Sequence, residues 1–237
     1  MKLAIVGAGT MGRIVRDMAL QNSGIDSVLT IEPALGESLF DIDAPDVIID
    51  FSHPDALEDI VAYVTSKQGR TGVVFATTGY TLSQEERIKG LGTIVPVIRS
   101  SNFSYGINSL KRIVEFAAPL LRDCADIEIV EKHHRQKVDS PSGTAIMLAD
   151  ACDPAHESSR LCGREGEMKR KNEIGLHSVR AGTIFGEHTV LFALKDEVIE
   201  IKHTAFSKKI FAKGAIEAAL WLKGKSPGFY PLEEVFY

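Results

Sequence analysis

The feature that most constrains the fold of this chain is a glycine-rich turn between a short apolar run and a helical pattern. Leu3–Val6 is apolar and rich in β-formers, and Met11–Gln21 has helical spacing. Glycines at the first, third and sixth positions of such a turn permit a tight bend, close approach of a pyrophosphate and close packing of the helix. We therefore expect a dinucleotide site rather than an ordinary strand-to-helix turn. The expected contact residues are Gly7, Ala8, Gly9, Thr10, Met11 and Gly12.

Short apolar runs and helical patterns alternate through the N-terminal part of the chain. The strand-like runs are Leu3–Val6, Val28–Ile31, Val47–Ile49, Val73–Ala76 and Ile94–Ile98. The helical patterns are Met11–Gln21, Ala56–Ser66 and Ser83–Leu91, the last with Ser83 as its expected N-cap. Because strands that alternate with helices form parallel sheets, this order predicts an α/β fold with a Rossmann-type doubly wound parallel sheet over residues 1–104.

Glu32 ends the second predicted strand, where a carboxylate accepts hydrogen bonds from the adenosine ribose and repels a 2′-phosphate. The next residue is Pro33 rather than an arginine, so no adjacent cation offsets that repulsion. We therefore expect NADH to be preferred and NADPH to be the second choice, although Arg13 or a distant lysine could still reach the phosphate. The alternative for Glu32 is a solvated strand end.

Two further turns follow predicted strands, at the edge of the sheet where ligands bind in this fold. Their hydroxyls and amide suit contact with the nicotinamide half of the cofactor, and simple turn chemistry is the alternative. The first turn supplies Ala76, Thr77 and Thr78, and the second supplies Ser100, Ser101, Asn102 and Phe103.

The pattern changes after residue 104. A helical stretch covers Gly106–Leu121, a polar segment that we expect to be a solvated loop covers Asp153–Gly175, and strand-like runs dominate elsewhere. We expect an α+β domain with an open mixed sheet over residues 105–214, and a C-terminal segment, 215–237, that returns to the first domain. The strand-like runs are Ile127–Val130, Leu176–Phe185, Thr189–Leu194 and Val198–Thr204.

The stretch 131–145 is dense in titratable and anion-binding groups. His133 and His134 can move protons near neutral pH, while Arg135 and Lys137 can hold anions. An extended strand would point the two histidines to opposite faces, so we expect the chain to turn directly before them.

A predicted helix start follows these residues. Ser140 is the expected N-cap and Pro141 the first helical residue, so the amides of Ser142, Gly143 and Thr144 would point outward unpaired. Such amides bind carboxylates and phosphates. Together with the two histidines, they predict a site for a small anionic substrate.

Three blocks of the sequence match one known family. His133–Ala145 carries the pattern His-His-Arg-x-Lys-x-Asp-x-Pro-Ser-Gly-Thr-Ala, and Ser178–Val190 and Phe211–Leu222 match two further blocks in order. In these blocks the chain resembles the dihydrodipicolinate reductase family, nicotinamide-dependent enzymes of the diaminopimelate and lysine pathway. The resemblance implies reduction of (2S,4S)-4-hydroxy-2,3,4,5-tetrahydrodipicolinate, with loss of water, to (S)-2,3,4,5-tetrahydrodipicolinate.

The same resemblance implies roles for particular residues. It makes His133 a proton donor or acceptor, and Lys137 the proton donor to the intermediate left by hydride addition. His134, Gly143 and Thr144 match positions that bind the carboxylates of the substrate. The resemblance also implies a homotetramer, assembled through the sheet of the second domain.

The sequence departs from the family in its cofactor turns. Thr10 stands where the family usually has an arginine, which again favours NADH. Ala76 replaces a glycine, and Ser100 and Ser101 replace a more apolar pair. Backbone groups can make the same contacts, so we expect the cofactor site to be retained.

Other roles are possible for the polar residues of the second half. Arg135 can form a structural ion pair with Glu131 or Asp139 instead of contacting substrate. Two residue sets could be considered for a metal, but neither matches a ligand-spacing template, so we expect no metal site. The two sets are Glu131, His133, His134 and Asp139, and Cys152, His156 and Cys162.

Composition limits the partners of the chain. With 32 acidic and 27 basic residues its net charge is -5, which argues against nucleic acid. Its apolar runs are shorter than the roughly 20 residues that span a bilayer, and its N-terminus lacks a secretory pattern. Its three scattered cysteines suit reduced thiols. We therefore expect a cytoplasmic protein that acts on a small cyclic dicarboxylate, without a membrane partner.

Two other functions compete with the reductase. One is another dehydrogenase of similar build, acting on aspartate or an amino-acid-derived semialdehyde, which should lack Lys137 together with Gly143 and Thr144. The other is a dinucleotide-binding protein without catalysis, which needs neither His133 nor Lys137. The presence of all these residues favours the reductase.

Overall fold

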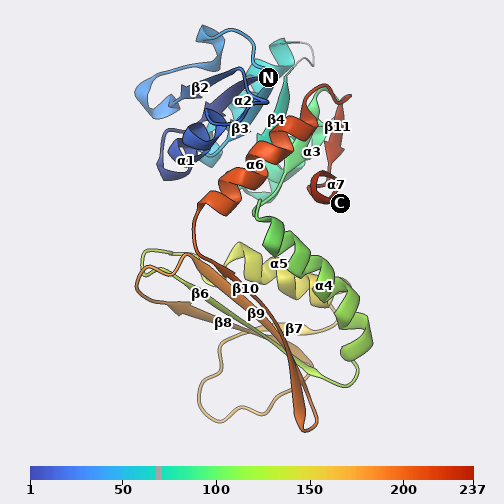
Figure 1. Ribbon diagram of the computed structural model, residues 1–237. Helices are drawn as coiled ribbons and strands as arrows, with labels where there is room; N and C mark the ends of the chain where they lie inside the picture. The colour runs from blue at the N-terminus through green and yellow to red at the C-terminus, as the bar shows by residue number, and fades with distance from the viewer. Residues whose placement is uncertain (68–70) are drawn as a thin grey trace. The chain divides into compact units, whose positions relative to one another are not determined.

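A computed structural model of the chain describes residues 1–67 and 71–237, and the chain divides into two compact units (Figure 1). The first unit contains Met1–Ser104 and Lys208–Tyr237, and the second contains Tyr105–Ser207. The C-terminal segment thus re-enters the first unit at Lys208, before the boundary at residue 215 that the sequence suggested. The reason is that helix α6 begins at Lys209 and already buries Ala212 in the core of the first unit.

The first unit is built on a six-stranded parallel sheet, in the order β11-β5-β4-β3-β1-β2. The apolar runs of the N-terminal part form five of these strands, and the C-terminal segment adds the last one beside β5. The predicted Rossmann-type sheet is therefore confirmed. The strands are β1 Lys2–Val6, β2 Ser27–Ile31, β3 Val47–Asp50, β4 Gly72–Phe75, β5 Pro96–Arg99 and β11 Gly228–Tyr230.

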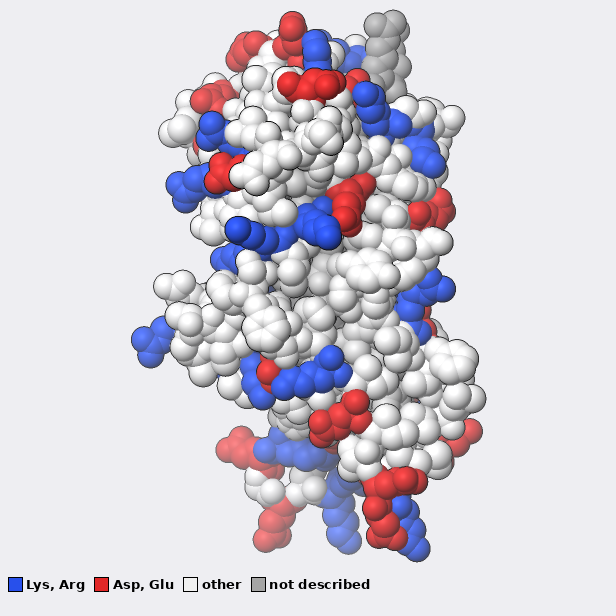
Figure 2. Space-filling model, viewed as in Figure 1, with Lys and Arg blue, Asp and Glu red and all other residues white. Residues whose placement is uncertain are grey.

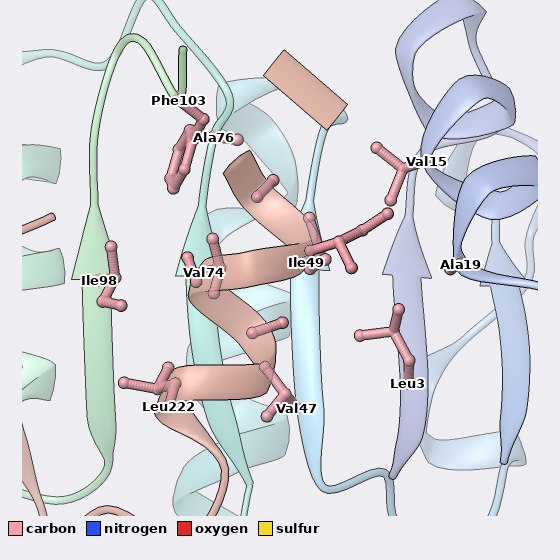
Figure 3. Close-up of a cluster of buried hydrophobic side chains, with 14 of the residues drawn as sticks. Leu3, Val15, Ala19, Val47, Ile49, Val74, Ala76, Ile98, Phe103 and Leu222 are labelled. Atoms are coloured by element: carbon pink, nitrogen blue, oxygen red, sulfur yellow. The ribbon is translucent and has the colours of Figure 1, made fainter. Parts of the chain in front are cut away.

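Helices cover both faces of this sheet because its strands are apolar on both sides. In β1, Leu3 and Ile5 point to one face, and Ala4 and Val6 point to the other. The first face packs against α1 and α6 (Figure 3), and the second packs against α2 and α3. The helices are α1 Thr10–Ala19, α2 Leu57–Ser66, α3 Leu82–Leu91, α6 Lys209–Leu222 and α7 Glu233–Phe236, with 3-10 turns at Pro33–Leu35, Leu39–Asp41 and Pro54–Ala56.

Helix α3 starts earlier than its pattern suggested, so the predicted N-cap Ser83 is wrong. Thr81 caps the helix, and its side chain accepts from the backbone N–H of Gln84 at 3.3 Å. Gln84 Oε1 in turn accepts from the backbone N–H of Thr81 at 2.9 Å, which completes a capping box. Leu82, the first helical residue, is 87% exposed, and apolar spacing therefore did not mark this first turn.

The second unit contains a mixed five-stranded sheet, in the order β10-β9-β6-β8-β7. Strand β9 runs antiparallel to β6 and β10, whereas β8 runs parallel to β6 and β7. The predicted α+β domain with an open mixed sheet is confirmed. The strands are β6 Asp126–His133, β7 Ser159–Cys162, β8 Glu173–Arg180, β9 Gly186–Leu194 and β10 Glu197–Ala205.

Strand β7 lies inside the segment Asp153–Gly175, so the prediction of a solvated loop is wrong for these residues. β7 pairs with β8 at the edge of the sheet, and all of its residues are half-buried or exposed. An edge strand of this kind needs little apolar alternation, which is the signal that identifies strands in a sequence.

Helices α4 (Tyr105–Leu121) and α5 (Gly143–Cys152) lie on one face of this sheet (Figure 1). Alternate residues of β6, from Ile127 to His133, point to that face, and the apolar ones join a core with both helices. The intervening residues, such as Glu128, point to the opposite face. One face thus carries the core and a polar cluster described below, and the other is open.

The surface is mixed in charge. On the face shown in Figure 2, basic and acidic side chains are interspersed over each unit, and neither sign forms a broad patch there. That face therefore lacks the extended basic track that binds nucleic acid phosphates. Within residues 1–67 and 71–237, the helices are all too short or too polar to cross a membrane.

Candidate active site

The glycine-rich turn between β1 and α1 leaves no room for a side chain at two of its glycines. Gly7 has a φ of 101°, and a Cβ on it would lie 2.5 Å from the carbonyl oxygen of Phe51. A Cβ on Gly12 would lie 1.8 Å from the carbonyl oxygen of Gly7. Gly9, by contrast, faces open space, as close approach of a pyrophosphate requires.

Glu32 and the start of α1 form one edge of this turn. Gly9 is the N-cap of α1 and has no side chain, so the first amides of the helix face outward. Glu32 Oε2 accepts from the backbone N–H of Ala8 at 2.7 Å, and its Oε1 accepts from that of Ala34 at 3.2 Å. These bonds hold the carboxylate beside the turn.

These features fit a dinucleotide. The turn offers open space over a glycine, the positive end of a helix, and a carboxylate fixed where a ribose is bound in this fold. The residues of the turn that remain accessible are Ala8, Gly9, Thr10 and Met11.

The turns after β4 and β5 contain residues that brace the structure and residues that face outward. Thr77 is buried, and its hydroxyl accepts from the backbone N–H of Ser52 at 2.9 Å, whereas Thr78 is exposed. Asn102 is buried, and its Oδ1 accepts from the backbone N–H of Ser104 at 2.9 Å. The residues expected to contact the nicotinamide therefore include both buried side chains that hold the turns in place and exposed side chains.

The other residues of these two turns follow the same division. Ala76 and Phe103 are part of the hydrophobic core of the first unit. Ser100 Oγ donates to the carbonyl of Asn102 at 3.0 Å, and Ser101 is exposed. A contact from Phe103 to a cofactor therefore has to use its backbone.

In the second unit, polar groups gather around Glu131 on the helix-covered face of the sheet. The Glu131 side chain is fully buried, and it accepts from Arg180 at 2.7 and 2.8 Å and from Ser178 Oγ at 2.7 Å. It also accepts from the backbone N–H of Ser142 at 3.1 Å and lies 2.5 Å from His133 Nδ1. One carboxylate thus joins β6, β8 and the start of α5.

Glu131 is ionised at neutral pH although it is buried. Burial alone would raise the pKa of Glu131, but hydrogen bonds from Arg180, Ser178 and His133 lower it to about 2. Burial lowers the pKa of His133 by more than the neighbouring carboxylate raises it. The imidazole is therefore neutral at neutral pH, with its proton on Nδ1 facing Glu131 and with Nε2 able to accept a proton.

Two further histidines stand in the same row of the sheet and were missed from the sequence. Glu131, His188 and His203 are cross-strand partners in β6, β9 and β10. His188 Nε2 lies 3.2 Å from Ser142 Oγ, and its ring centroid lies 5.1 Å from that of His133. Burial lowers the pKa of His188 to about 3, and repulsion from His133 in its protonated form adds to this effect. The alternation of histidine with buried apolar residues along β9 is the signal that could have found it.

Helix α5 begins at Gly143, so the predicted N-cap Ser140 is wrong. Ser142 is the N-cap, and its hydroxyl makes the capping hydrogen bond within the helix at 3.2 Å. The amide of Ser142 is not available to a ligand because it donates to Glu131. The first turn of the helix is formed by Gly143, which faces open space, and Thr144, which is buried.

The prediction that the chain turns directly before the two histidines is wrong. Strand β6 continues through His133, and the turn follows His134. The carbonyl of His134 accepts from the backbone N–H of Lys137 at 3.1 Å, which closes this turn. Lys137 Nζ lies 2.7 Å from Asp139 Oδ1. His134 Nδ1 is buried and has no hydrogen-bond partner among residues 1–67 and 71–237, so it is a polar atom that a ligand can satisfy.

The ion pair considered for Arg135 does not form within the described part of the chain. Glu131 pairs with Arg180 instead, and Asp139 pairs with Lys137. Arg180 Nη2 also donates to the carbonyl of Asp139 at 2.6 Å, so an arginine that the sequence did not single out anchors this loop. Arg135 is exposed, and its guanidinium can meet an anionic ligand.

The structure also places the cysteines and the residues considered as metal ligands. In the described ranges, no group of three or more His, Cys, Asp and Glu side chains is arranged to hold a metal ion. The three cysteines are free, with Cys152 buried and Cys124 and Cys162 exposed. Burial raises the pKa of Cys152 to about 12, so its thiol stays protonated.

Comparison with known proteins gives consistent results over the whole chain. Two family models match it, "Dihydrodipicolinate reductase, N-terminus" over residues 1–103 and "Dihydrodipicolinate reductase, C-terminus" over residues 106–236. The chain is 44% identical to the 4-hydroxy-tetrahydrodipicolinate reductase of Exiguobacterium sibiricum, over 100% of this chain and 96% of that protein. It is 41% identical to that of Clostridium novyi, over 96% of this chain and 94% of that protein.

One solved structure has the same fold. The dipicolinate-bound dihydrodipicolinate reductase from Paenisporosarcina sp. TG-14 matches with a TM-score of 0.73. The alignment covers 97% of this chain and 96% of that chain, at 22% sequence identity. The similarity therefore extends over both units of the chain.

Proposed function

This chain belongs to the dihydrodipicolinate reductase family, and from that premise we propose that its second unit performs the proton chemistry of a 4-hydroxy-tetrahydrodipicolinate reductase. The main support for the proposal is the hydrogen-bonded pair Glu131–His133. Arg180 donates to Glu131, and Lys137 lies close enough to His133 to interact with it electrostatically. The relatives match over nearly their full length, so neither another dehydrogenase nor a binding protein without catalysis is favoured.

The reaction consumes 4-hydroxy-tetrahydrodipicolinate, NADH and a proton, and yields tetrahydrodipicolinate, NAD+ and water. Loss of water from the substrate leaves a conjugated cyclic imine. When bound, a nicotinamide cofactor would supply a hydride to one carbon of that conjugated system, and negative charge would then build up at the other end of the system. A group of the protein has to deliver a proton there.

We propose Lys137 as the donor of that proton. Its side chain is 23% exposed, and its Nζ is paired with Asp139 Oδ1 at 2.7 Å, which limits the movement of the amine. His133 is proposed to accept or return a proton through Nε2, because Glu131 holds the other ring nitrogen.

The carboxylates of the substrate are proposed to bind at His134, Gly143 and Thr144. His134 supplies a buried ring nitrogen without a partner among the described residues. Gly143 and Thr144 form the first turn of α5, where the helix dipole and the amides favour an anion. The open space at Gly143 leaves room for the ligand.

The cofactor is proposed to bind in the first unit. The glycine turn would hold the pyrophosphate, Glu32 the adenosine ribose, and the turns after β4 and β5 the nicotinamide half. The open space at Gly9 and the fixed carboxylate of Glu32 support this assignment. The proposed contacts are Gly7, Ala8, Gly9, Thr10, Met11, Gly12, Glu32, Ala76, Thr77, Thr78, Ser100, Ser101, Asn102 and Phe103.

A coupled assay tests the activity. The purified chain receives the product of the preceding synthase, made in situ, and the absorbance of NADH or NADPH is followed. We expect oxidation of the cofactor that depends on the synthase product. An absence of oxidation with both cofactors would refute the proposed function.

For the cofactor, we expect a lower Michaelis constant with NADH than with NADPH, because Glu32 repels a 2′-phosphate. Changing Glu32→Gln removes the charge and keeps an acceptor for the ribose. We expect this change to shift kcat/KM toward NADPH on the order of tenfold, which corresponds to about 1.4 kcal/mol. Glu86→Gln, on the exposed face of α3, is the control. A wild-type preference for NADPH would contradict the argument.

We also propose a homotetramer that forms through the open face of the second sheet. Leu191 lies in the middle of that face, opposite the helices. Val179 and Val198 lie on the same face and are 41% and 54% exposed. Apolar side chains on the open face of a sheet favour association with another copy.

Changing Leu191→Lys is expected to dissociate this assembly without unfolding the chain. The cross-strand neighbours of Leu191 are Glu128 and Glu200, so the lysine can pair with a carboxylate in a single chain, whereas in the assembly it would place a charge in the middle of the interface. Light scattering should then give the mass of one chain, 25.9 kDa, instead of four times that mass. Ile113→Lys, on the exposed side of α4, should leave the assembly intact. A tetramer of the Leu191 variant would exclude this face.

A cytoplasmic location is part of the same proposal. The three cysteines are free thiols, which suits a reducing compartment. The reaction also draws on the pool of reduced nicotinamide cofactor that supplies biosynthesis. A fluorescent fusion of the full chain, followed by fractionation, would test this location.

A further inference from the structure

Asp50 is a buried acid for which neither the sequence motifs nor the proposed chemistry has a role. It ends β3 and is 0% exposed. Its Oδ1 accepts from the backbone N–H of Ser52 at 3.0 Å and from Ser52 Oγ at 2.5 Å, and its Oδ2 accepts from the Tyr80 hydroxyl at 2.7 Å. Burying a carboxyl group is costly, and these donors offset part of that cost.

The same residue ties the turn after β3 to the turn after β4. The carbonyl of Asp50 accepts from the backbone N–H of Ala76 at 2.9 Å. The amide of Ser52, which donates to the carboxyl group, also donates to Thr77 Oγ1 at 2.9 Å. Tyr80 closes the turn after β4 onto the other oxygen of the carboxyl group. Asp50 therefore holds the turn after β3 and the turn after β4 together through hydrogen bonds.

The connection continues to the turn after β5. The guanidinium of Arg99 lies over the Tyr80 ring, 5.0 Å from its centroid. Arg99 Nη1 donates to the carbonyl of Ser100 at 2.7 Å, and Glu85 holds the other side of the guanidinium. A chain of contacts thus runs from Asp50 through Tyr80 and Arg99 to Ser100.

The turn after β3 also lies against the glycine turn. The backbone N–H of Phe51, next to Asp50, donates to the carbonyl of Val6 at 2.9 Å. The carbonyl oxygen of Phe51 occupies the space where a side chain on Gly7 would lie. Asp50 is therefore linked to the glycine turn and to the turns after β4 and β5, three of the segments that the proposed function places at the cofactor.

We propose that Asp50 is a positioning residue for the cofactor site, acting through Ser52, Tyr80 and Arg99 on the turns after β4 and β5. This inference rests on the proposed function for the assignment of those turns to the nicotinamide. Asp50 itself is buried beneath them and acts without touching the cofactor. An apolar residue would fill the space at a lower cost of burial, but it would leave the donors of both turns unsatisfied.

The experiment compares Asp50→Asn with the wild-type full chain. The amide keeps the shape and one acceptor, but it presents an N–H group where a second acceptor was. We expect the dissociation constant for NADH, measured by fluorescence titration, to rise roughly ten- to a hundredfold. Hydrogen exchange without cofactor should quicken in residues 76–80 and 100–104. Dipicolinate, used as a probe of the second unit, should raise the melting temperature as much as in the wild type.

Kinetic and control measurements separate positioning from general damage. The Michaelis constant for NADH should rise while kcat at saturating NADH stays within about twofold. Tyr80→Phe removes the hydrogen bond between Tyr80 and Asp50 from the other side and should also weaken NADH binding. This variant tests the proposal if Asp50→Asn does not fold. Asp43→Asn, an exposed acid of the same unit, should change nothing.

Two outcomes would overturn the inference. One is an NADH affinity of Asp50→Asn within about twofold of the wild type, with unchanged exchange in the two turns. The other is an equal loss of NADH and dipicolinate binding, which would indicate general destabilisation. These outcomes are distinct from a failure of the proposed function, in which the wild-type chain itself would not oxidise NADH with the synthase product.

Discussion

Changing Lys137→Ala should lower kcat by about 10²–10⁴-fold while the dissociation constant for NADH stays within about twofold. The expected loss is large because the proton supplied by Lys137 is needed in the transition state, where a positioned donor contributes about 10²–10⁴-fold to the rate. The affinity for NADH should stay nearly constant because Lys137 belongs to the second unit and the proposed cofactor contacts belong to the first. Steady-state kinetics and fluorescence titration measure the two quantities separately.

Two variants sharpen this prediction. Lys137→Arg retains a cation next to Asp139 but is a poor proton donor, so kcat should stay low even if substrate still binds. Lys169→Ala removes an exposed lysine of the same unit and should behave as the wild type. If NADH binding collapses in Lys137→Ala, or if Lys137→Arg restores turnover, Lys137 is not the proton donor.

The second large effect is expected for Glu131→Gln, which should lower the free energy of unfolding by about 3–5 kcal/mol. The glutamine would leave the half-buried guanidinium of Arg180 without its carboxylate, and its amide would face donors from Ser178 and Ser142. kcat should fall as well, by at least about tenfold, because His133 loses the group that fixes its tautomer. Denaturant unfolding and steady-state kinetics give the two values.

The pH dependence of stability provides an independent check. The pKa of Glu131 is lowered from its usual value of 4.5 to about 2 in the folded chain. A lowered pKa means that the carboxylate stabilises the fold fully above pH 4.5, and that this contribution is lost as the pH falls from 4.5 toward 2. The stability of Glu131→Gln should therefore fall less steeply than that of the wild type in this range. Glu165→Gln, an exposed acid, should follow the wild type. Equal slopes for all three proteins would contradict the assignment.

The sequence predicted the first unit well because its signals are local. The glycine turn, the apolar strands and the helical spacings each depend on a few consecutive residues, and these residues are buried on both faces of the sheet. The errors occurred where a cap or an edge strand decides the boundary. Thr81 and Ser142 cap their helices through hydrogen bonds that the serines two positions away, Ser83 and Ser140, do not make.

In the second unit, the sequence singled out candidate residues between His133 and Thr144, but not the side chains that hold Glu131 and His133 in place. Arg180, Ser178 and His188 come from β8 and β9, and only strand pairing brings them to Glu131. The sequence also offered Arg135 as a partner for Glu131, because Arg135 is near in the chain. The structure shows that Arg180 takes this place, since it lies on the adjacent strand, paired with His133.

The sequence by itself determined the sheet of the first unit, the glycine turn and the family to which the loop 133–145 belongs, because these depend on spacing within short segments. The tertiary structure alone decided the charge and tautomer of the site. Apart from His133, the donors to Glu131 lie 11, 47 and 49 residues away in the chain, at Ser142, Ser178 and Arg180. A pKa depends on burial and on neighbours in space, and both are set only when β6, β8 and α5 meet.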